Sequence, residues 1–252
     1  MITINDFFKP INLKDNISEK DYNKTRPLIN FAKSFSQIAY QSIYLIDYYK
    51  RTFLYVSENP LFLCGYTPAH VQHEGYSFYL KNVPSEDLEM LLKINIAGFK
   101  FYKNIPTAER LQYSISYDFH LKQPNNHEIL INHKLAPIIL DKDYNIWIAV
   151  CIVSLSSNDE AGNVKIKNVN QPYYHEYDLS KDEWIERKMI RLNRQEKEIL
   201  LLSSQGFTIE EIAKRLNVSF DTIKFHRKSI FKKLQTKNIT ESISAATNFT
   251  LI

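Results

Sequence analysis

The chain has few of the residues that common metal, phosphate and cofactor sites require. Only two of its 252 residues are cysteine, and Cys64 and Cys151 lie far apart, without the paired spacing of a metal site. The five glycines do not cluster, which excludes Walker-type and dinucleotide-binding motifs. The histidines show no recognised ligand spacing either. We therefore expect no metal site and no cofactor.

Signals for export and for membrane insertion are also missing. The first residues, Met1–Asp6, lack the basic-then-apolar pattern of a signal peptide. The longest apolar run, around Ile146–Leu155, is too short to cross a bilayer. Together with the low cysteine content, this predicts a cytoplasmic protein without a membrane partner.

Basic residues are present, but they are concentrated near the C-terminus. The net charge is +4, and residues 184–252 hold 13 Lys and Arg against 7 Asp and Glu, which leaves a net of −2 for the rest. A chain of this length can form two modest domains, each with its own core. We expect the basic surface to belong to the C-terminal domain.

Three short helices with tight corners are predicted in this C-terminal part. Gly206 stands where a helix needs a left-handed cap, and Thr208 with Glu211 fits a capping box for the next helix. Asn217 can adopt the left-handed turn conformation, and Ser219 is a favourable N-cap for the third helix. This order predicts a helix-turn-helix.

The third helix has an apolar face and a cationic face. Three aliphatic residues recur at helical spacing, and three lysines repeat every fourth residue: Ile223, Ile230 and Leu234, and Lys224, Lys228 and Lys232. Residues 224–237 hold six basic side chains and no acidic one. This is the charge pattern of an element that lies against phosphates, and a solvated lysine face is the alternative.

This stretch resembles the LuxR-type helix-turn-helix. The matching residues are Leu192-Asn-Arg-Gln-Glu-Lys-Glu-Ile-Leu200, Gly206, Glu211-Ile-Ala213, Leu216, Ser219, Thr222-Ile-Lys-Phe-His226, Ile230 and Lys233-Leu234. The resemblance implies four helices, of which the third enters the major groove. It also implies that the fourth, from Thr240 to about Asn248, dimerises through the side that carries Ile243, Ala246 and Thr247.

The resemblance further implies which side chains bind DNA. The positions that match the family's usual contacts are Lys224, Phe225 and Lys228, with Thr222 and Arg227 as phosphate neighbours and Lys232 on the same basic helix. Phe225 departs from the smaller aliphatic residue common there, so the base that it reads stays open. His226 is expected to be a half-buried structural residue rather than a ligand, and no catalytic residue is expected.

The middle of the chain predicts two strands, short helices and three further strands. The expected elements are strands at Ile43–Asp47, Thr52–Val56, Leu111–Leu121, Glu128–Ile138 and Asn145–Leu155, and a helix at Pro84–Gly98. With the turns Leu63-Cys-Gly65-Tyr-Thr-Pro68 and Pro84-Ser-Glu-Asp87, this order resembles a PAS domain. That implies an α+β protein, in which a PAS-like five-stranded antiparallel sheet with helices and a sensory pocket precedes a four-helix LuxR-type helix-turn-helix domain.

Four segments follow from these assignments. They are an N-terminal segment (1–40), the PAS-like sensor domain (41–156), a hairpin or linker (157–187) and the DNA-binding domain (188–252). Pro27–Gln41 is expected to form an amphipathic helix, packed on its own domain or on the same helix of a second subunit. An extra hairpin is predicted between Asn163 and Trp184, and Glu183–Leu192 is expected to lead helically into the last domain.

These features predict a sequence-specific transcriptional regulator whose PAS-like domain senses a signal or mediates dimerisation. The expected partners are double-stranded DNA and a second copy of the chain; RNA polymerase is a further candidate, and a small-molecule ligand is unidentified. An acyl-lactone receptor regulator is an alternative, although its pocket uses tryptophans in the N-terminal half and the chain has only Trp147 and Trp184. An enzyme with an appended DNA-binding domain would rely on Cys64 with His70 or His73.

Overall fold

The structure, a computed structural model, describes residues 2–11, 17–249 and 251–252. The chain divides into two compact units, Met1–Arg187 and Lys188–Ile252, which are described separately below. Within the described ranges, no helix combines the length and the apolar character needed to cross a membrane. The same ranges contain no group of three or more His, Cys, Asp or Glu residues placed to hold a metal ion.

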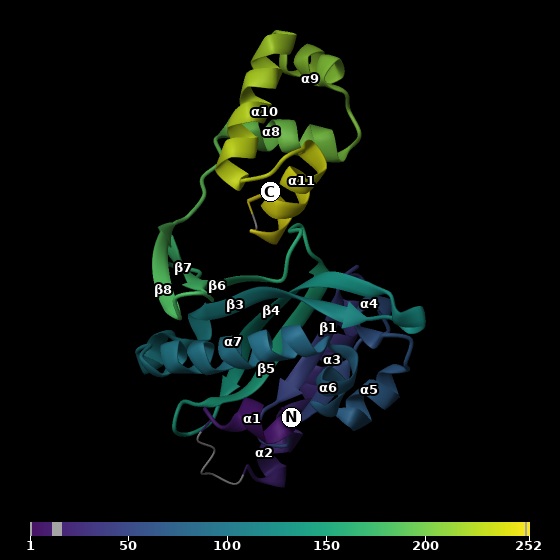
Figure 1. The fold of residues 1–252 in the computed structure, drawn as a ribbon, viewed down its shortest axis with the longest axis vertical. Coiled ribbons are helices and arrows are strands. Elements are labelled where there is room, and N and C mark those ends of the chain that lie inside the picture. Colours follow the sequence, from purple (N-terminus) through teal and green to yellow (C-terminus); the bar gives the residue numbers. More distant parts are fainter. Residues whose placement is uncertain (1, 12–16, 250) are drawn as a thin grey trace. The chain divides into compact units, whose positions relative to one another are not determined.

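The N-terminal unit is built on one antiparallel sheet in the order β2-β1-β5-β4-β3-β6-β7-β8 (Figure 1). The strands are β1 (Ser42–Asp47), β2 (Thr52–Val56), β3 (Tyr113–Lys122), β4 (Glu128–Leu140), β5 (Ile146–Leu155), β6 (Gly162–Asn168), β7 (Tyr173–Asp178) and β8 (Glu183–Lys188). The first five lie where the sequence predicts them. The expected α+β fold with a PAS-like antiparallel sheet is confirmed, and the sheet continues for three strands beyond the predicted five.

Helices cover one face of the central strands. They are α4 (Pro60–Leu63), α5 (Pro68–Glu74), α6 (Ser77–Asn82) and α7 (Ser85–Lys103), with short 3-10 turns at η1 (Thr107–Gln112) and η2 (Pro124–Asn126). Alternate residues of the strands point toward these helices, so that Phe119 of β3 and Ile131 of β4, which are register partners, are both buried in the core. The core of the unit therefore lies between this sheet face and the helices.

Helix α7 is the longest helix of the unit and lies across the sheet (Figure 1). Glu86 and Asp87 stand in its first turn and Lys100 and Lys103 in its last. At both ends these charges interact favourably with the helix dipole and stabilise the helix. Its Leu88, Leu91 and Ile94 recur at spacings of three, and all are buried. The helix predicted over Pro84–Gly98 is thus confirmed and extends to Lys103.

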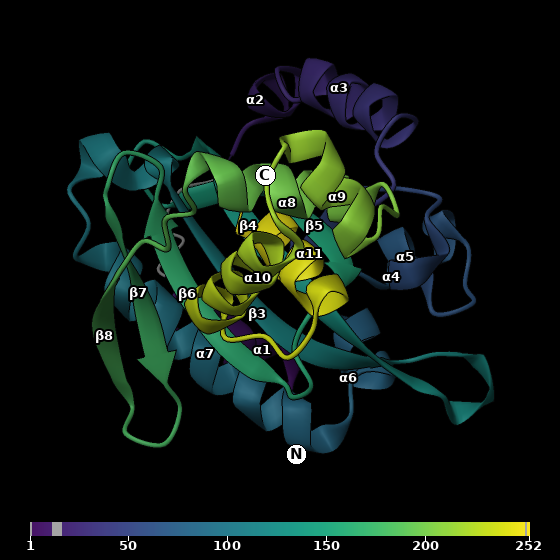
Figure 2. The ribbon, with the colours of Figure 1, turned by 90° about the horizontal axis from the view of Figure 1, so that it is seen from above.

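The predicted extra hairpin is confirmed as β6 and β7, and it joins the sheet because β6 pairs with β3 (Figure 2). The expectation that Glu183–Leu192 is helical is wrong, because Glu183–Lys188 forms strand β8. The reason is tertiary packing: the Trp184 ring lies 5.1 Å from that of Phe101 and 4.8 Å from that of Tyr177. Burial of this ring outweighs the helix propensity of the charged residues around it.

Among the described residues before the sheet there are three helices: α1 (Ile4–Phe8), α2 (Glu19–Asn23) and α3 (Arg26–Ser36). Phe7 and Phe8 of α1 belong to the central core, which the sequence did not indicate. The predicted amphipathic helix is confirmed as α3, but it ends at Ser36 and buries mainly Ala32. Its Phe31 and Phe35 are exposed and stack on each other with ring centroids 5.9 Å apart.

The C-terminal unit consists of four helices, α8 (Arg194–Ser204), α9 (Ile209–Leu216), α10 (Phe220–Leu234) and α11 (Ile239–Asn248). The predicted corners are confirmed. Gly206 has a positive φ of 89° after α8, and Asn217 adopts the left-handed conformation after α9. Thr208 and Glu211 form the capping box of α9, and the Ser219 hydroxyl caps α10. Local sequence therefore determines where these helices begin and end.

Candidate functional site

Helix α10 has the two faces that its sequence predicts. Ile223, Ile230 and Leu234 are buried against the other helices of the unit. On the opposite side, the lysines at positions 224, 228 and 232 are exposed. The helix therefore presents one cationic stripe to its surroundings.

Phe225 lies beside this stripe and is exposed over 69% of its surface. The Lys224 ammonium lies 4.3 Å from the Phe220 ring centroid, so that this lysine leans toward the N-terminal end of the helix. Lys228, one turn further along, is exposed. Two cations and an unburied aromatic ring thus share about one turn of α10.

Thr222 and Arg227 are less accessible than the lysines. The Thr222 hydroxyl lies 2.8 Å from that of Ser219, at the cap where α10 begins. Arg227 is half-buried, with its guanidinium carbon 5.8 Å from the Phe231 ring centroid, and this burial lowers the pKa of the guanidinium. The six predicted DNA-binding residues therefore divide into an exposed group and a half-buried group.

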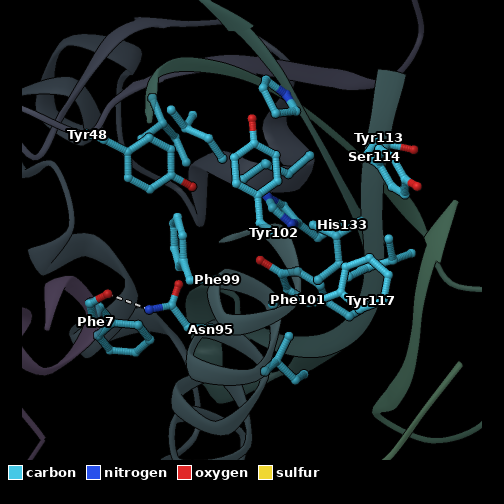
Figure 3. A pocket seen from close by; sticks show the side chains of 18 of the residues that line it. Phe7, Tyr48, Asn95, Phe99, Phe101, Tyr102, Tyr113, Ser114, Tyr117 and His133 are labelled. Atoms are coloured by element: carbon cyan, nitrogen blue, oxygen red, sulfur yellow. Dashed lines mark hydrogen bonds between the residues drawn. The ribbon is translucent and has the colours of Figure 1, made fainter. Parts of the chain in front are cut away.

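The N-terminal unit contains a cavity of about 100 Å³ between the sheet and α7 (Figure 3). Its lining is mainly aliphatic and aromatic, and it includes Phe7 of α1, Phe99 of α7 and Tyr117 of β3. An engineered apolar cavity of about 150 Å³ in another protein takes up a single benzene ring. The space is thus suited to a small molecule.

Two polar atoms at this cavity are buried without a hydrogen-bond partner among the described residues: the Tyr102 hydroxyl and His133 Nδ1. Figure 3 shows both side chains among those that surround the space. The other ring nitrogen of His133, Nε2, bonds to the Tyr44 hydroxyl, which bonds in turn to that of Tyr79. An unsatisfied buried polar group is costly, so an occupant that formed a hydrogen bond with either atom would be stabilised.

The cavity lining carries no charge at neutral pH. Burial lowers the pKa of His133 to about 3, so its imidazole is neutral. The remaining lining residues are apolar, aromatic or uncharged polar side chains such as Asn95 and Ser114. An ionic occupant would find no counter-charge here.

The cysteine and the other histidines considered from the sequence do not line this cavity. Cys64 is buried, its thiol faces the Phe62 carbonyl oxygen at 3.6 Å, and burial raises the pKa of the thiol to about 12. His70 stacks on Tyr66, with ring centroids 4.6 Å apart. Sequence reasoning could not single out His133, because its partners come from strands and helices distant along the chain.

Comparison with known proteins identifies the C-terminal unit. The family model of bacterial regulatory proteins of the luxR family matches residues 191–246. Residues 191–246 are a LuxR-type DNA-binding domain. The chain is accordingly a DNA-binding regulator with a PAS-like N-terminal unit.

Solved structures with low sequence identity resemble parts or most of the chain. The complex of phage VqmA with DPO is 16% identical, covers 92% of this chain and 90% of that chain, and gives a TM-score of 0.32. The Vibrio cholerae VqmA dimer without target DNA is 13% identical, with coverages of 94% and 89% and a TM-score of 0.31. The PAS-B domain of Drosophila melanogaster Cycle is 16% identical, with coverages of 46% and 99% and a TM-score of 0.34.

A buried carboxylate holds the helices of the LuxR-type domain together. Glu196 of α8 is 1% exposed and accepts hydrogen bonds from Lys233 Nζ at 2.7 Å and from the Ser229 hydroxyl at 2.8 Å. It also closes a capping box with Asn193. Lys233, one of the six basic residues of the stretch 224–237, is thereby directed into its own domain. The spacing of Asn193 and Glu196 could have predicted the cap of α8, but it could not have predicted the hydrogen bond from Lys233 to Glu196.

Two further expectations concern His226 and α11. His226 is half-buried, as predicted for a structural histidine. The fourth helix is confirmed, but Ala246, which was expected on its dimerising side, is fully buried in the core of its own domain. Ile243 is also packed against that core, whereas Thr247 is exposed. The side assigned to a second subunit is therefore largely used within the domain.

Proposed function

We propose that this protein is a non-enzymatic, ligand-responsive transcriptional regulator that acts in the cytoplasm as a homodimer. In this proposal, α10 lies in the major groove of DNA. The observation that carries it is the exposed lysine stripe of α10 within a LuxR-type domain. From Lys224 to the end of α10 this face carries no acidic residue, and Asp221 stands in the first turn of the helix. A cationic helix face releases counterions when it meets phosphates, and this favours binding.

Within this proposal, the six residues have different tasks. Lys224, Phe225 and Lys228 face base edges, since they are the exposed side chains near the middle of α10. Thr222, Arg227 and Lys232 are assigned to phosphates and fix the register of the helix. The half-burial of Arg227 leaves less of its guanidinium free than in an exposed arginine.

Replacing both Lys224 and Lys228 by alanine tests this assignment. We expect at least a tenfold loss of affinity for a selected DNA site and a smaller loss for random DNA, because a base contact contributes about 1 to 3 kcal/mol of sequence discrimination. Lys20→Ala, an exposed lysine of the N-terminal unit, is the matched control and should bind as the wild type does. Unchanged affinity in the double variant would refute the role of α10.

We further propose that a second copy of the chain packs on α3. Phe31 and Phe35 of α3 lie one turn apart, and Ile38 follows in the turn after the helix ends at Ser36; all three are exposed. One recognition helix reads few base pairs, so a regulator of this kind gains specificity from two half-sites held by a dimer. In sedimentation experiments, Phe31→Glu with Phe35→Glu should produce monomers, whereas Ile96→Glu, at an exposed position of α7, should not. A dimer that survives the double change would exclude α3.

The cavity of the N-terminal unit supports the sensing part of the proposal. Its uncharged lining and its two unpartnered polar atoms favour a small, uncharged molecule with at least one hydrogen-bonding group. Such a ligand, bound to the folded state alone, raises the melting temperature by mass action. Screening small uncharged metabolites by thermal shift tests this, and the shift of any hit should shrink when His133 is replaced by leucine.

The two alternative functions receive less support. Neither Trp147 nor Trp184 lines the cavity, whereas the acyl-lactone receptors use tryptophans in their pocket. For an enzyme, Cys64 would have to be a nucleophile, but its thiol is buried and its raised pKa keeps it protonated. A thiol-reactive probe should therefore label Cys64 only slowly in the folded protein.

A further inference from the structure

Phe225 is the most exposed large apolar side chain in the described part of the C-terminal unit. It is 69% exposed, against 47% for Leu201 and 37% for Phe220. The core side of α10 is already occupied by aliphatic residues, so this ring contributes little to packing within the domain. Single exposed apolar residues are common on proteins, and it is the position of this one that matters.

The ring lies on the side of α10 that carries the lysines. At 100° per residue, Phe225 stands about 60° from Lys228 and about 20° from Lys232 around the helix axis. Lys224 leans away toward Phe220, at 4.3 Å from that ring, and the Phe225 ring meets that of His226 edge-on, with centroids 5.7 Å apart. Most of the Phe225 ring surface therefore faces outward beside Lys228 and Lys232, one turn after Asp221.

Base edges in the major groove are mostly hydrogen-bond donors and acceptors, which a phenylalanine cannot satisfy. The exception is the C5 methyl group of thymine, an apolar feature that aromatic and aliphatic side chains contact. We infer that Phe225 reads thymine in each half-site through this methyl group, while the neighbouring lysines contact phosphates and polar base edges. The inference rests on the proposed function, in which α10 lies in the major groove.

Uracil tests this reading because it differs from thymine only in the missing methyl group. A DNA site is first selected from random duplexes with the full-length chain, and each thymine of the half-site is then replaced in turn by deoxyuridine. At one position we expect a loss of about 4- to 10-fold in wild-type affinity, the effect of one buried methyl group. Phe225→Ala should bind the thymine and uracil duplexes equally, and Phe225→Leu should discriminate less than the wild type.

Two controls separate this inference from the proposed function. Phe225→Ala should keep the wild-type melting temperature and salt dependence, because the ring is exposed and uncharged. Lys224→Ala should lose affinity but keep the preference for thymine. If no uracil substitution weakens wild-type binding, or if Phe225→Ala keeps the discrimination, the reading of thymine by Phe225 is overturned while DNA binding stands. If the wild type selects no site at all, both are overturned.

Discussion

Removing the buried carboxylate of Glu196 should destabilise the LuxR-type domain more than any surface charge does. Glu196→Ala deletes hydrogen bonds from Lys233, Ser229 and the backbone of Asn193, at 2.7 to 2.8 Å. The Lys233 side chain is 37% exposed and can turn to water, so the full penalty of an unpaired buried charge does not apply. The charged hydrogen bond and the lost helix cap together give about 3 kcal/mol.

Both tryptophans lie in the N-terminal unit, so fluorescence does not report on this domain. Hydrogen exchange of the α8 and α10 amides in the full-length chain reports on the stability of this domain. A loss of about 3 kcal/mol corresponds to roughly 100-fold faster exchange of the most protected amides. Glu198→Ala is the matched control, because its partner Arg194 is 92% exposed and the pair contributes less than about 1 kcal/mol. Exchange in Glu196→Ala within about threefold of the wild type would refute the reasoning.

The same carboxylate gives the domain a predictable dependence on pH. Burial alone raises the pKa of Glu196, but the hydrogen bonds from Lys233, Asn193 and Ser229 outweigh it, so the net pKa lies below its usual range. A carboxyl group whose pKa is lower in the folded state stabilises above its unfolded pKa, near 4.3, and loses this contribution as pH falls through the folded value. Glu196→Gln should lack this part of the acid sensitivity.

Three further predictions concern other parts of the chain. Tyr102→Phe removes an unsatisfied buried hydroxyl and should raise the free energy of unfolding by about 1 kcal/mol, whereas Tyr44→Phe breaks two hydrogen bonds and should lower it by about as much. Urea unfolding followed by fluorescence measures both changes. If the two variants changed the free energy of unfolding in the same direction, the Tyr102 hydroxyl would not be an unsatisfied group. Gly206→Ala meets no atom within 4 Å but forces alanine to a φ of 89°, so it should cost about 1 kcal/mol in hydrogen exchange of the last domain, and a neutral result would count against the left-handed cap. His133 binds a proton in the unfolded chain below about pH 6.5, but in the folded chain only near pH 3. The free energy of unfolding should therefore decrease by up to about 1.4 kcal/mol for each unit by which the pH is lowered from about 6.5 to about 3. The variant His133→Leu should remove this slope from the urea unfolding data.

Features that depend on local sequence could be predicted, and features that depend on distant contacts could not. The caps at Thr208 and Ser219 and the left-handed residue Asn217 follow from side chains that bond to their own backbone within a few positions. Strand β8 has no such local signal, because its structure depends on the packing of Trp184 against Phe101. Charged residues alone would have favoured a helix there.

The candidate sites show the same division. The lysine stripe of α10 follows from a spacing of four residues, which places these side chains on one helix face whatever the rest of the chain does. Lys233 follows that helix too, but its bond to Glu196 depends on how α8 crosses α10. The cavity gives no sequence signal, because Tyr102 and His133 meet around it only after the helix and the sheet have packed.

Phe7 of α1 and Ile166 of β6 both line the cavity, and Phe8 and Val164 belong to the same core. A truncated protein that keeps only residues 41–156 would lose all four side chains and would leave the edge of β3 unpaired. We expect such a fragment to aggregate or to bind nothing. The folded N-terminal unit thus extends to both sides of the PAS-like segment, from the N-terminal helix to Arg187, and fusions to other domains should be joined there.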